Sequence, residues 1–257
     1  MAAKQELRRD STIDPGDVDR FGRLGGQWWN PKGPMKALHE FNPVRVAYLR
    51  ELLWQYLPIE DKPRDRHSAE PLKGLAILDI GCGAGLLSEP LARLGARMTS
   101  IDPSRPNIEV ARDHAAQTSL EIDYRCMTAE ALAAEGAQFD AVLAMEVIEH
   151  VRDFGRFLGQ AAAMVRPGGM LAAATLNRTW KSFAFAIIGA EYVLRWVPRG
   201  THDWNRFVTP EELTAALHAA RLRIKDETGV VYDSLARKWR LSHDMDINYM
   251  MAAQRPK

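Results

Sequence analysis

The chain has 257 residues, of which 46% are hydrophobic and 26% charged, and its formal net charge is +1. These values are ordinary for one globular domain, and they exclude the broad basic field of a nucleic-acid-binding protein. The two cysteines do not suggest a disulfide framework, so we expect a reducing, cytoplasmic compartment. The start lacks the apolar core of a secretory signal. No apolar run reaches the roughly 20 residues that a membrane-spanning helix needs.

The first quarter of the chain predicts a cover followed by a linker. Residues 1–20 are charged and poor in large apolar side chains, which indicates a flexible start. Residues 21–57 hold an irregular Gly- and Pro-rich stretch and then an amphipathic helix from near Pro43. Residues 58–74 contain three prolines and many charges, which is typical of a linker. We interpret residues 21–257 as a single domain.

From residue 75 onward, strand and helix patterns alternate. Strands are predicted at LAILDI, ARMTSID, IDYRCM, FDAVLAME and RPGGMLAAATL, with helices over 105–117 and 153–165. After an insert over 179–205, a helix with Thr209 as its N-cap and the strands RLRIKDETGVVYD and DINYMMAAQ fill residues 206–257. This order predicts an α/β fold, a doubly wound and mostly parallel seven-stranded sheet whose cofactor-binding core spans 75–178.

The stretch LDIGCGAGLL predicts a nucleoside site. Glycines after a strand let the backbone turn tightly and approach a ligand, and Asp102 at the end of the next strand can accept hydrogen bonds from ribose hydroxyls. Leu86 stands where the nicotinamide fingerprint needs its third glycine, which disfavours a dehydrogenase. The pattern Asp79, Gly81, Gly83 is instead that of class I methyltransferases, which use S-adenosylmethionine.

Further segments resemble one family within that class. WWNPKGPMKALHEFNPVR, FDAVLAMEVIEHV, RPGGMLAAATLNR, GAEYVLRWVPRGTHDWNRF and DINYM are together similar to the ubiquinone biosynthesis O-methyltransferases, from about Phe21 to Met250. The resemblance implies a Rossmann-like fold and methylation of phenolic hydroxyls on a polyprenyl catechol and on 3-demethylubiquinol. It also implies S-adenosylmethionine as cofactor and other ubiquinone-biosynthesis proteins as partners.

The resemblance also implies which residues hold the cofactor: Arg45, Gly81, Asp102 and Met145. Arg45 can pair with the methionine carboxylate as a bidentate donor, or it can be a solvated helix arginine. Met145 ends the fourth strand, at the ligand-binding edge of such sheets, or it packs in the core. Trp28 and Trp29 either cover the cofactor or pack as a core pair.

The segment MEVIEH places Glu146, Glu149 and His150 after the fourth strand. A phenol has a pKa of about 10, so its proton must be removed before it attacks at neutral pH. Three interpretations stay open: a divalent metal site, with Mg²⁺ or Zn²⁺; a general base, Glu149 or His150, without metal; or capping of the next helix. His202, oriented by Asp203, is another candidate base, and a local turn is its alternative.

Residues 183–197 are almost all apolar, with basic residues on both sides at Arg178, Lys181, Arg195 and Arg199. Such a segment suits the surface of an anionic bilayer, where it can admit a lipid-dissolved tail. We therefore expect a lid over 179–205 and peripheral association with the inner membrane. An internal cap helix is the alternative.

Two rival functions remain from the residues alone. The motifs common to all class I methyltransferases fit O- or N-methylation of another small apolar acceptor equally well. A membrane-peripheral scaffold that binds the cofactor without turnover is also compatible, although the complete set of Asp79, Gly81, Gly83 and Asp102 argues against lost activity.

Overall fold

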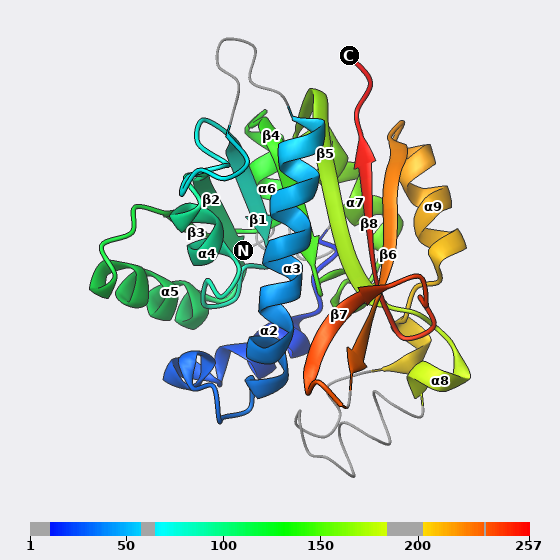
Figure 1. The fold of residues 1–257 in the computed structure, drawn as a ribbon. Coiled ribbons are helices and arrows are strands. Elements are labelled where there is room, and N and C mark those ends of the chain that lie inside the picture. Colours follow the sequence, from blue (N-terminus) through cyan, green and yellow to red (C-terminus); the bar gives the residue numbers. More distant parts are fainter. Residues whose placement is uncertain (1–10, 58–64, 184–202, 234) are drawn as a thin grey trace, which may run out of the picture.

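The computed structural model describes residues 11–57, 65–183, 203–233 and 235–257. Within them lies one eight-stranded sheet with the strand order β3-β2-β1-β4-β5-β8-β6-β7 (Figure 1). The first five strands of that order are parallel, whereas β8, β6 and β7 pair antiparallel. The bounds are β1 Ala76–Ile80, β2 Arg97–Asp102, β3 Asp123–Cys126, β4 Phe139–Met145, β5 Val165–Leu176, β6 Arg223–Asp233, β7 Lys238–Ser242 and β8 Asn248–Gln254.

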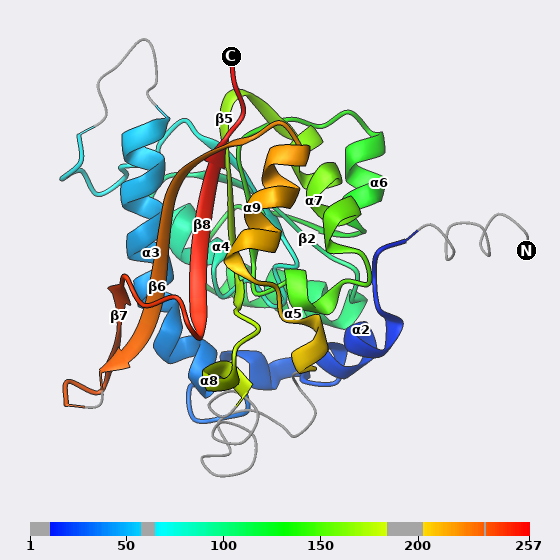
Figure 2. The ribbon, with the colours of Figure 1, turned by 90° about the vertical axis from the view of Figure 1, so that its right-hand side faces the viewer.

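Helices cover both faces of the sheet, as Figure 2 shows from the side. One face packs on α3 and α4, and the opposite face packs on α6, α7 and α9. The predicted doubly wound α/β fold is therefore confirmed. The bounds are α2 Pro15–Gly22, η1 Gly25–Trp29, α3 Lys36–Tyr56, α4 Ser88–Arg93, α5 Arg105–Gln117, α6 Ala129–Ala134, η2 Ile148–His150, α7 Phe154–Ala163, α8 Trp180–Ser182, η4 Trp204–Arg206 and α9 Pro210–Ala219.

The eighth strand corrects the prediction of seven. The segment KWRLS folds back on β6 as β7, and Figure 1 shows it beside α3. Its short alternation of polar and apolar residues is a strand signal, but it follows a charged turn and is only five residues long. The added strand extends the sheet toward the N-terminal part of α3.

The N-terminal part of the chain is more structured than the expected flexible start. Asp14 caps α2, and its side chain accepts a hydrogen bond from the backbone N–H of Gly16. Thr12 donates to Glu130 through its backbone N–H, at 2.7 Å, and through its hydroxyl, at 2.6 Å. We call residues 11–22 the N-terminal strap, because they run from α6 toward the cofactor edge of the sheet.

Local signals place two other helices. Helix α3 begins at Lys36, seven residues before the predicted start, and continues through Pro43, which cannot donate the internal hydrogen bond of its turn. Thr209 and Glu212 form a reciprocal capping box at the start of α9, which confirms the predicted N-cap.

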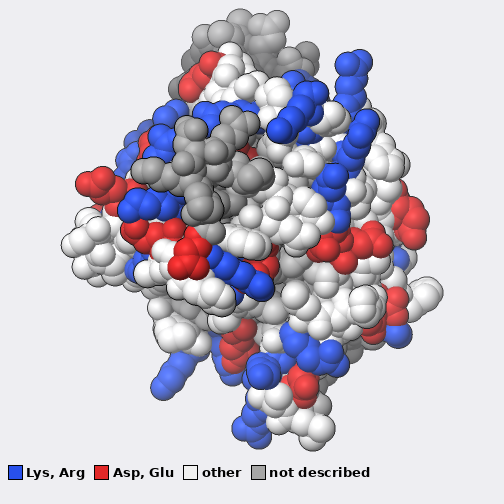
Figure 3. All heavy atoms as spheres, turned by 45° about the horizontal axis from the view of Figure 1, so that its top comes forward, with Lys and Arg blue, Asp and Glu red and all other residues white. Residues whose placement is uncertain are grey.

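Charges of both signs are mixed on the face of the molecule that Figure 3 shows. On the face shown in Figure 3, Lys and Arg lie among Asp and Glu rather than in one continuous field. This distribution agrees with the net charge of +1 and gives no footprint for a nucleic acid on that face. None of the described helices has the length and apolar character to cross a bilayer.

Candidate active site

A cavity of about 300 Å³ lies at the carboxyl ends of β1, β2 and β4. This edge is where ligands bind in open α/β sheets. The strap, η1, α3 and β7 complete its wall. Of the site residues predicted from the sequence, the cavity wall contains Arg45, Asp79, Gly81, Gly83, Asp102, Met145, Glu146, Glu149 and His150. The structure thus brings together all the predicted site residues that it describes.

Two glycines of the loop have backbones that only glycine adopts without strain. Gly81 has φ +70° and Gly83 has φ +54°. A Cβ at Gly81 would lie 2.5 Å from Val147 Cγ2, and one at Gly83 would lie 2.7 Å from the Trp28 ring. Any side chain here would displace Val147 or Trp28, so only glycine lets this loop line the cavity with its backbone.

Asp102 ties the loop to the next strand. Its carboxylate accepts hydrogen bonds from the backbone N–H of Gly83 at 3.0 Å and of Ser104 at 2.8 Å, and from the Asn107 amide at 3.3 Å. Burial raises the pKa of Asp102, and the bonds from Ser104 and Gly83 oppose that rise. The acid therefore supports the loop, and it lines the cavity in which it is expected to bind the ribose.

Asp79 and Arg45 are buried residues of the cavity wall. Burial raises the pKa of Asp79 to about 6, against the hydrogen bond from Ser88 and the charge of Arg45. The guanidinium of Arg45 donates to Asn42 Oδ1 at 2.9 Å, and its Nε has no hydrogen-bond partner among the described residues. A buried N–H of a charged group without a partner is costly, so this atom points to a ligand acceptor such as a carboxylate.

The two neighbouring tryptophans have different environments. Trp28 lines the cavity, and its indole N–H donates to Asn107 Oδ1 at 3.0 Å. Trp29 stacks on His114, with ring centroids 3.5 Å apart, and donates to the Ala84 carbonyl. Trp28 therefore covers the cavity, whereas Trp29 fixes η1 against α5.

Glu146 and Glu149 follow β4 but turn apart. Glu146 has φ +60°, an unusual backbone for a residue other than glycine, and such strain often accompanies function. Its buried Oε1 has no hydrogen-bond partner among the described residues. Burial and the neighbouring Glu149 raise the pKa of Glu146 to about 8, which Arg45 opposes. Glu149 instead accepts a hydrogen bond from the Thr175 hydroxyl at 2.7 Å.

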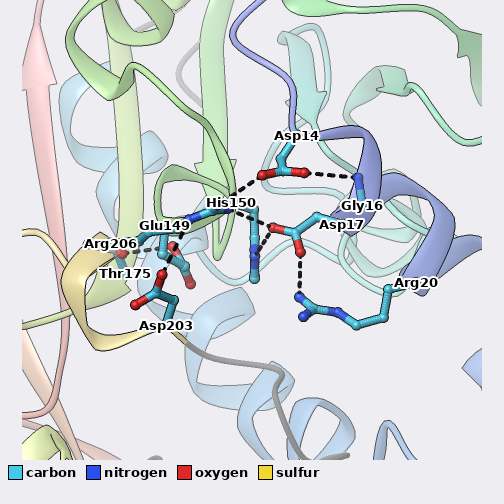
Figure 4. Close-up of polar contacts among 9 residues, drawn as sticks. All are labelled: Asp14, Gly16, Asp17, Arg20, Glu149, His150, Thr175, Asp203 and Arg206. Carbon is cyan, nitrogen blue, oxygen red and sulfur yellow. Dashed lines mark hydrogen bonds and ion pairs between the residues drawn. The ribbon is translucent and has the colours of Figure 1, made fainter.

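His150 faces the strap (Figure 4). Its Nδ1 lies 3.2 Å from Asp17 Oδ2, and its ring meets the edge of Phe21 at 5.1 Å. Arg206 of η4 pairs with Asp17 at 3.3 Å and with Asp14 at 2.7 Å. One ionic network therefore joins the strap, the MEVIEH motif and the chain just beyond the insert.

The predicted metal site stays a prediction without support from this geometry. Glu149 is bonded to Thr175 and His150 to Asp17, so the three side chains do not converge. Throughout the described ranges, no group of three or more His, Cys, Asp or Glu side chains is arranged to hold a metal ion. The η2 turn, which directs adjacent residues to different neighbours, is the physical reason.

The insert is described only at its two ends. His202, Arg195 and Arg199 lie outside the described residues. Asp203 accepts from the backbone N–H of Asn205 as the N-cap of η4, which confirms the local-turn alternative for that residue. Arg178 pairs with Glu212, and Lys181 pairs with Asp246. Both residues thus have ionic partners within the protein.

Several cavity residues did not follow from the sequence. Asp17, Asn107, Phe41 and Trp239 line the cavity, although no motif marks them. Each is placed by packing between segments far apart in the chain. The only local signal is the helix-start pattern Asp-Pro-Gly-Asp at residues 14–17, which indicates an ordered strap.

Comparison with known proteins identifies the family. The methyltransferase domain family matches residues 78–173. A ubiquinone biosynthesis O-methyltransferase of Methylocella silvestris is 62% identical over 253 residues, covering 98% of this chain and 99% of that protein. The protein of the same name from Brucella ovis is 54% identical over 246 residues, covering 96% and 97%.

The chain belongs to the ubiquinone biosynthesis O-methyltransferase family. The resemblance seen in the sequence is therefore confirmed. The predicted activity, that of an S-adenosylmethionine-dependent O-methyltransferase, is confirmed with it.

Solved structures support the fold of the family. A methyltransferase from Thermotoga maritima, described as a possible histamine N-methyltransferase, matches with a TM-score of 0.58 at 16% identity, over 90% of this chain and 97% of that one. The magnesium protoporphyrin IX methyltransferase of Synechocystis with bound S-adenosylmethionine matches with a TM-score of 0.54 at 17% identity, over 82% and 78%. At these identities the likeness concerns the class I methyltransferase fold alone.

Proposed function

We propose that the chain methylates phenolic hydroxyls of polyprenylated ubiquinone precursors, a polyprenyl catechol and 3-demethylubiquinol, with S-adenosylmethionine. The observation that carries this proposal is the shared cavity. It combines a glycine cradle, a buried arginine with an unpartnered Nε and the ionisable side chains of MEVIEH, in a chain whose relatives are named ubiquinone biosynthesis O-methyltransferases. The cavity walls thus offer a nucleoside site beside groups able to receive a proton.

The chain's own residues fit the cofactor. Arg45 Nε would bind the methionine carboxylate, Asp102 the ribose hydroxyls, and the backbone at Gly81 and Gly83 would admit the nucleoside. Met145 would supply the floor at the end of β4. When bound, S-adenosylmethionine supplies a methyl group activated by a positively charged sulfur. Positioning of the acceptor then makes the largest contribution to the rate.

His150 is the proton acceptor that the geometry favours. With Nδ1 donating to Asp17, the other ring nitrogen keeps a lone pair for the phenolic proton. Glu149 is fully buried against Thr175, so it supports the turn rather than moving a proton. His202, outside the described residues, remains a second candidate.

A methyl-transfer assay tests this function. We expect turnover on both a short-tailed polyprenyl catechol and a short-tailed demethylquinol, and none on an acceptor without a phenolic hydroxyl. Turnover restricted to unrelated amines or carboxylates would overturn the proposed acceptor class while leaving the family unchanged.

Membrane association is the second part of the proposal. Trp180 is 79% exposed, and it packs with Phe183 and Trp204 in an aromatic cluster at the ends of the insert. Exposed aromatic rings are enriched where proteins meet the bilayer interface. Arg178 and Lys181 are already ion-paired within the protein. The electrostatic attraction to anionic lipid must therefore come mainly from Arg195 and Arg199.

Vesicle co-sedimentation tests the docking segment. Phe183→Ser/Ile187→Ser and Arg195→Glu/Arg199→Glu should each reduce binding to anionic vesicles and activity on a long-tailed substrate, with activity on a tail-less catechol retained. Binding should also fall with added salt. If wild-type protein stays in the supernatant with anionic vesicles, the membrane hypothesis is wrong and the segment is an internal cap.

A further inference from the structure

Trp239 has an unsatisfied polar atom at the cavity. It lies on the added edge strand β7 and lines the cavity together with Ile247 and Asn248. Its Nε1 is buried and has no hydrogen-bond partner in the described part of the chain. Buried N–H groups are nearly always partnered in native proteins, and the indole N–H can only donate. This atom therefore calls for an acceptor that enters the cavity.

Ring contacts locate Trp239 relative to the cofactor end. The guanidinium of Arg45 lies 5.2 Å from the centre of the Phe41 ring, and the Phe41 ring lies 5.3 Å from that of Trp239. Tyr232, the cross-strand neighbour of Trp239, holds it from behind at 5.4 Å. The ring of Phe41 thus contacts both Arg45 and Trp239, and all three residues line the same cavity.

The surroundings suit a flat ring that bears oxygen. Phe41 packs beside Trp239, and Leu176 and Ile247 add apolar wall to the same cavity. Aromatic walls bind flat rings by offset or edge contacts. An apolar tail alone would leave the indole N–H unpaired, so the ligand must present an oxygen there.

We propose that Trp239 Nε1 donates a hydrogen bond to the ring oxygen of the acceptor next to the one that is methylated. This inference rests on the proposed function. A donor to the attacking oxygen would hold electron density away from the reaction, and an indole cannot take a proton. The neighbouring oxygen is therefore its partner, and Trp239 determines specificity for acceptors with two adjacent oxygens.

Binding measurements test the role of Trp239. The acceptor is titrated in the presence of S-adenosylhomocysteine, as a short-prenyl catechol and as an analogue whose non-methylated hydroxyl is replaced by a methyl group. Wild-type protein should bind the catechol about three- to tenfold more tightly than the analogue. Trp239→Phe, which keeps the aromatic wall, should bind the two equally and keep its affinity for S-adenosylhomocysteine.

Trp54→Phe is the matched control, because Trp54 lies on α3 outside the cavity wall and should keep the preference. Equal affinities in the wild type would overturn the inference without any variant, and so would a preference that survives in Trp239→Phe. Methyl transfer by the wild type to the catechol is measured separately. Its absence would refute the proposed function, whereas its presence with no effect of Trp239→Phe refutes only this inference.

Discussion

Asp102→Ala should lower the affinity for S-adenosylmethionine and destabilise the glycine loop that contacts Asp102. Hydrogen bonds to a charged group contribute about 1.5–3 kcal/mol, so loss of the ribose contacts should raise the Kd for S-adenosylmethionine about 10- to 150-fold. The same change leaves the backbone N–H groups of Gly83 and Ser104 without their acceptor. Each unsatisfied N–H costs about 1–3 kcal/mol of stability, partly offset because a buried carboxylate is itself unfavourable.

Ser100→Ala provides the matched control on the same strand. Ser100 is fully buried on β2, donates to Ser88 Oγ at 3.0 Å and is not part of the cavity wall. Ser100→Ala should lower the free energy of unfolding by about 1 kcal/mol and leave the Kd for S-adenosylmethionine unchanged. Calorimetric titration and urea unfolding measure both quantities. Unchanged affinity in Asp102→Ala would remove Asp102 from the site, and equal weakening in both variants would assign the effect to destabilisation.

Three further predictions concern charge and protons. If a divalent metal acts at the motif, a chelator should abolish turnover and Mg²⁺ or Zn²⁺ should restore it, while Glu146→Ala and Glu149→Ala keep cofactor affinity; full activity in excess chelator would exclude the metal. The pKa of Asp79 is raised in the folded state to about 6, above an unfolded value of about 4. Its stabilising contribution is therefore complete below about pH 4 and lost as pH rises through about 6, and Asp79→Asn should flatten that part of the stability curve in urea titrations. Asp17→Asn, which removes the carboxylate facing His150, should lower kcat about tenfold with unchanged cofactor affinity; an unaltered kcat would leave His150 without a role in proton removal.

Local chemistry made part of the site predictable. The glycine loop and Asp102 follow directly from strand-end and turn signals, because their geometry is set within a few residues. Arg45 came only from the resemblance to a family, since a helix arginine carries no signal of its burial. The strands other than β7 were also predictable from local sequence, because each is an apolar run bounded by turn residues.

The other site contacts could not be predicted, because they join residues far apart in the chain. His150 meets Asp17, 133 positions away in the chain, and Trp28 meets Asn107, 79 positions away. The three ionisable residues of MEVIEH look like one cluster in the sequence, but the left-handed backbone at Glu146 and the η2 turn send them to different partners. Proximity in sequence was therefore a poor guide to proximity in space.

The walls of the cavity come from two parts of the chain. The segment shared with methyltransferase domains in general, residues 78–173, contains the glycine loop and the acid motif. Trp28, Arg45 and Trp239 stand outside it, on an N-terminal cover and an added edge strand. Because Trp28 packs on Gly83 and Arg45 holds the unpartnered Nε, changes in the N-terminal cover would alter the cofactor cradle as well as the acceptor pocket. A fragment trimmed to residues 78–173 would therefore lack groups that the proposed cofactor site needs, Arg45 among them.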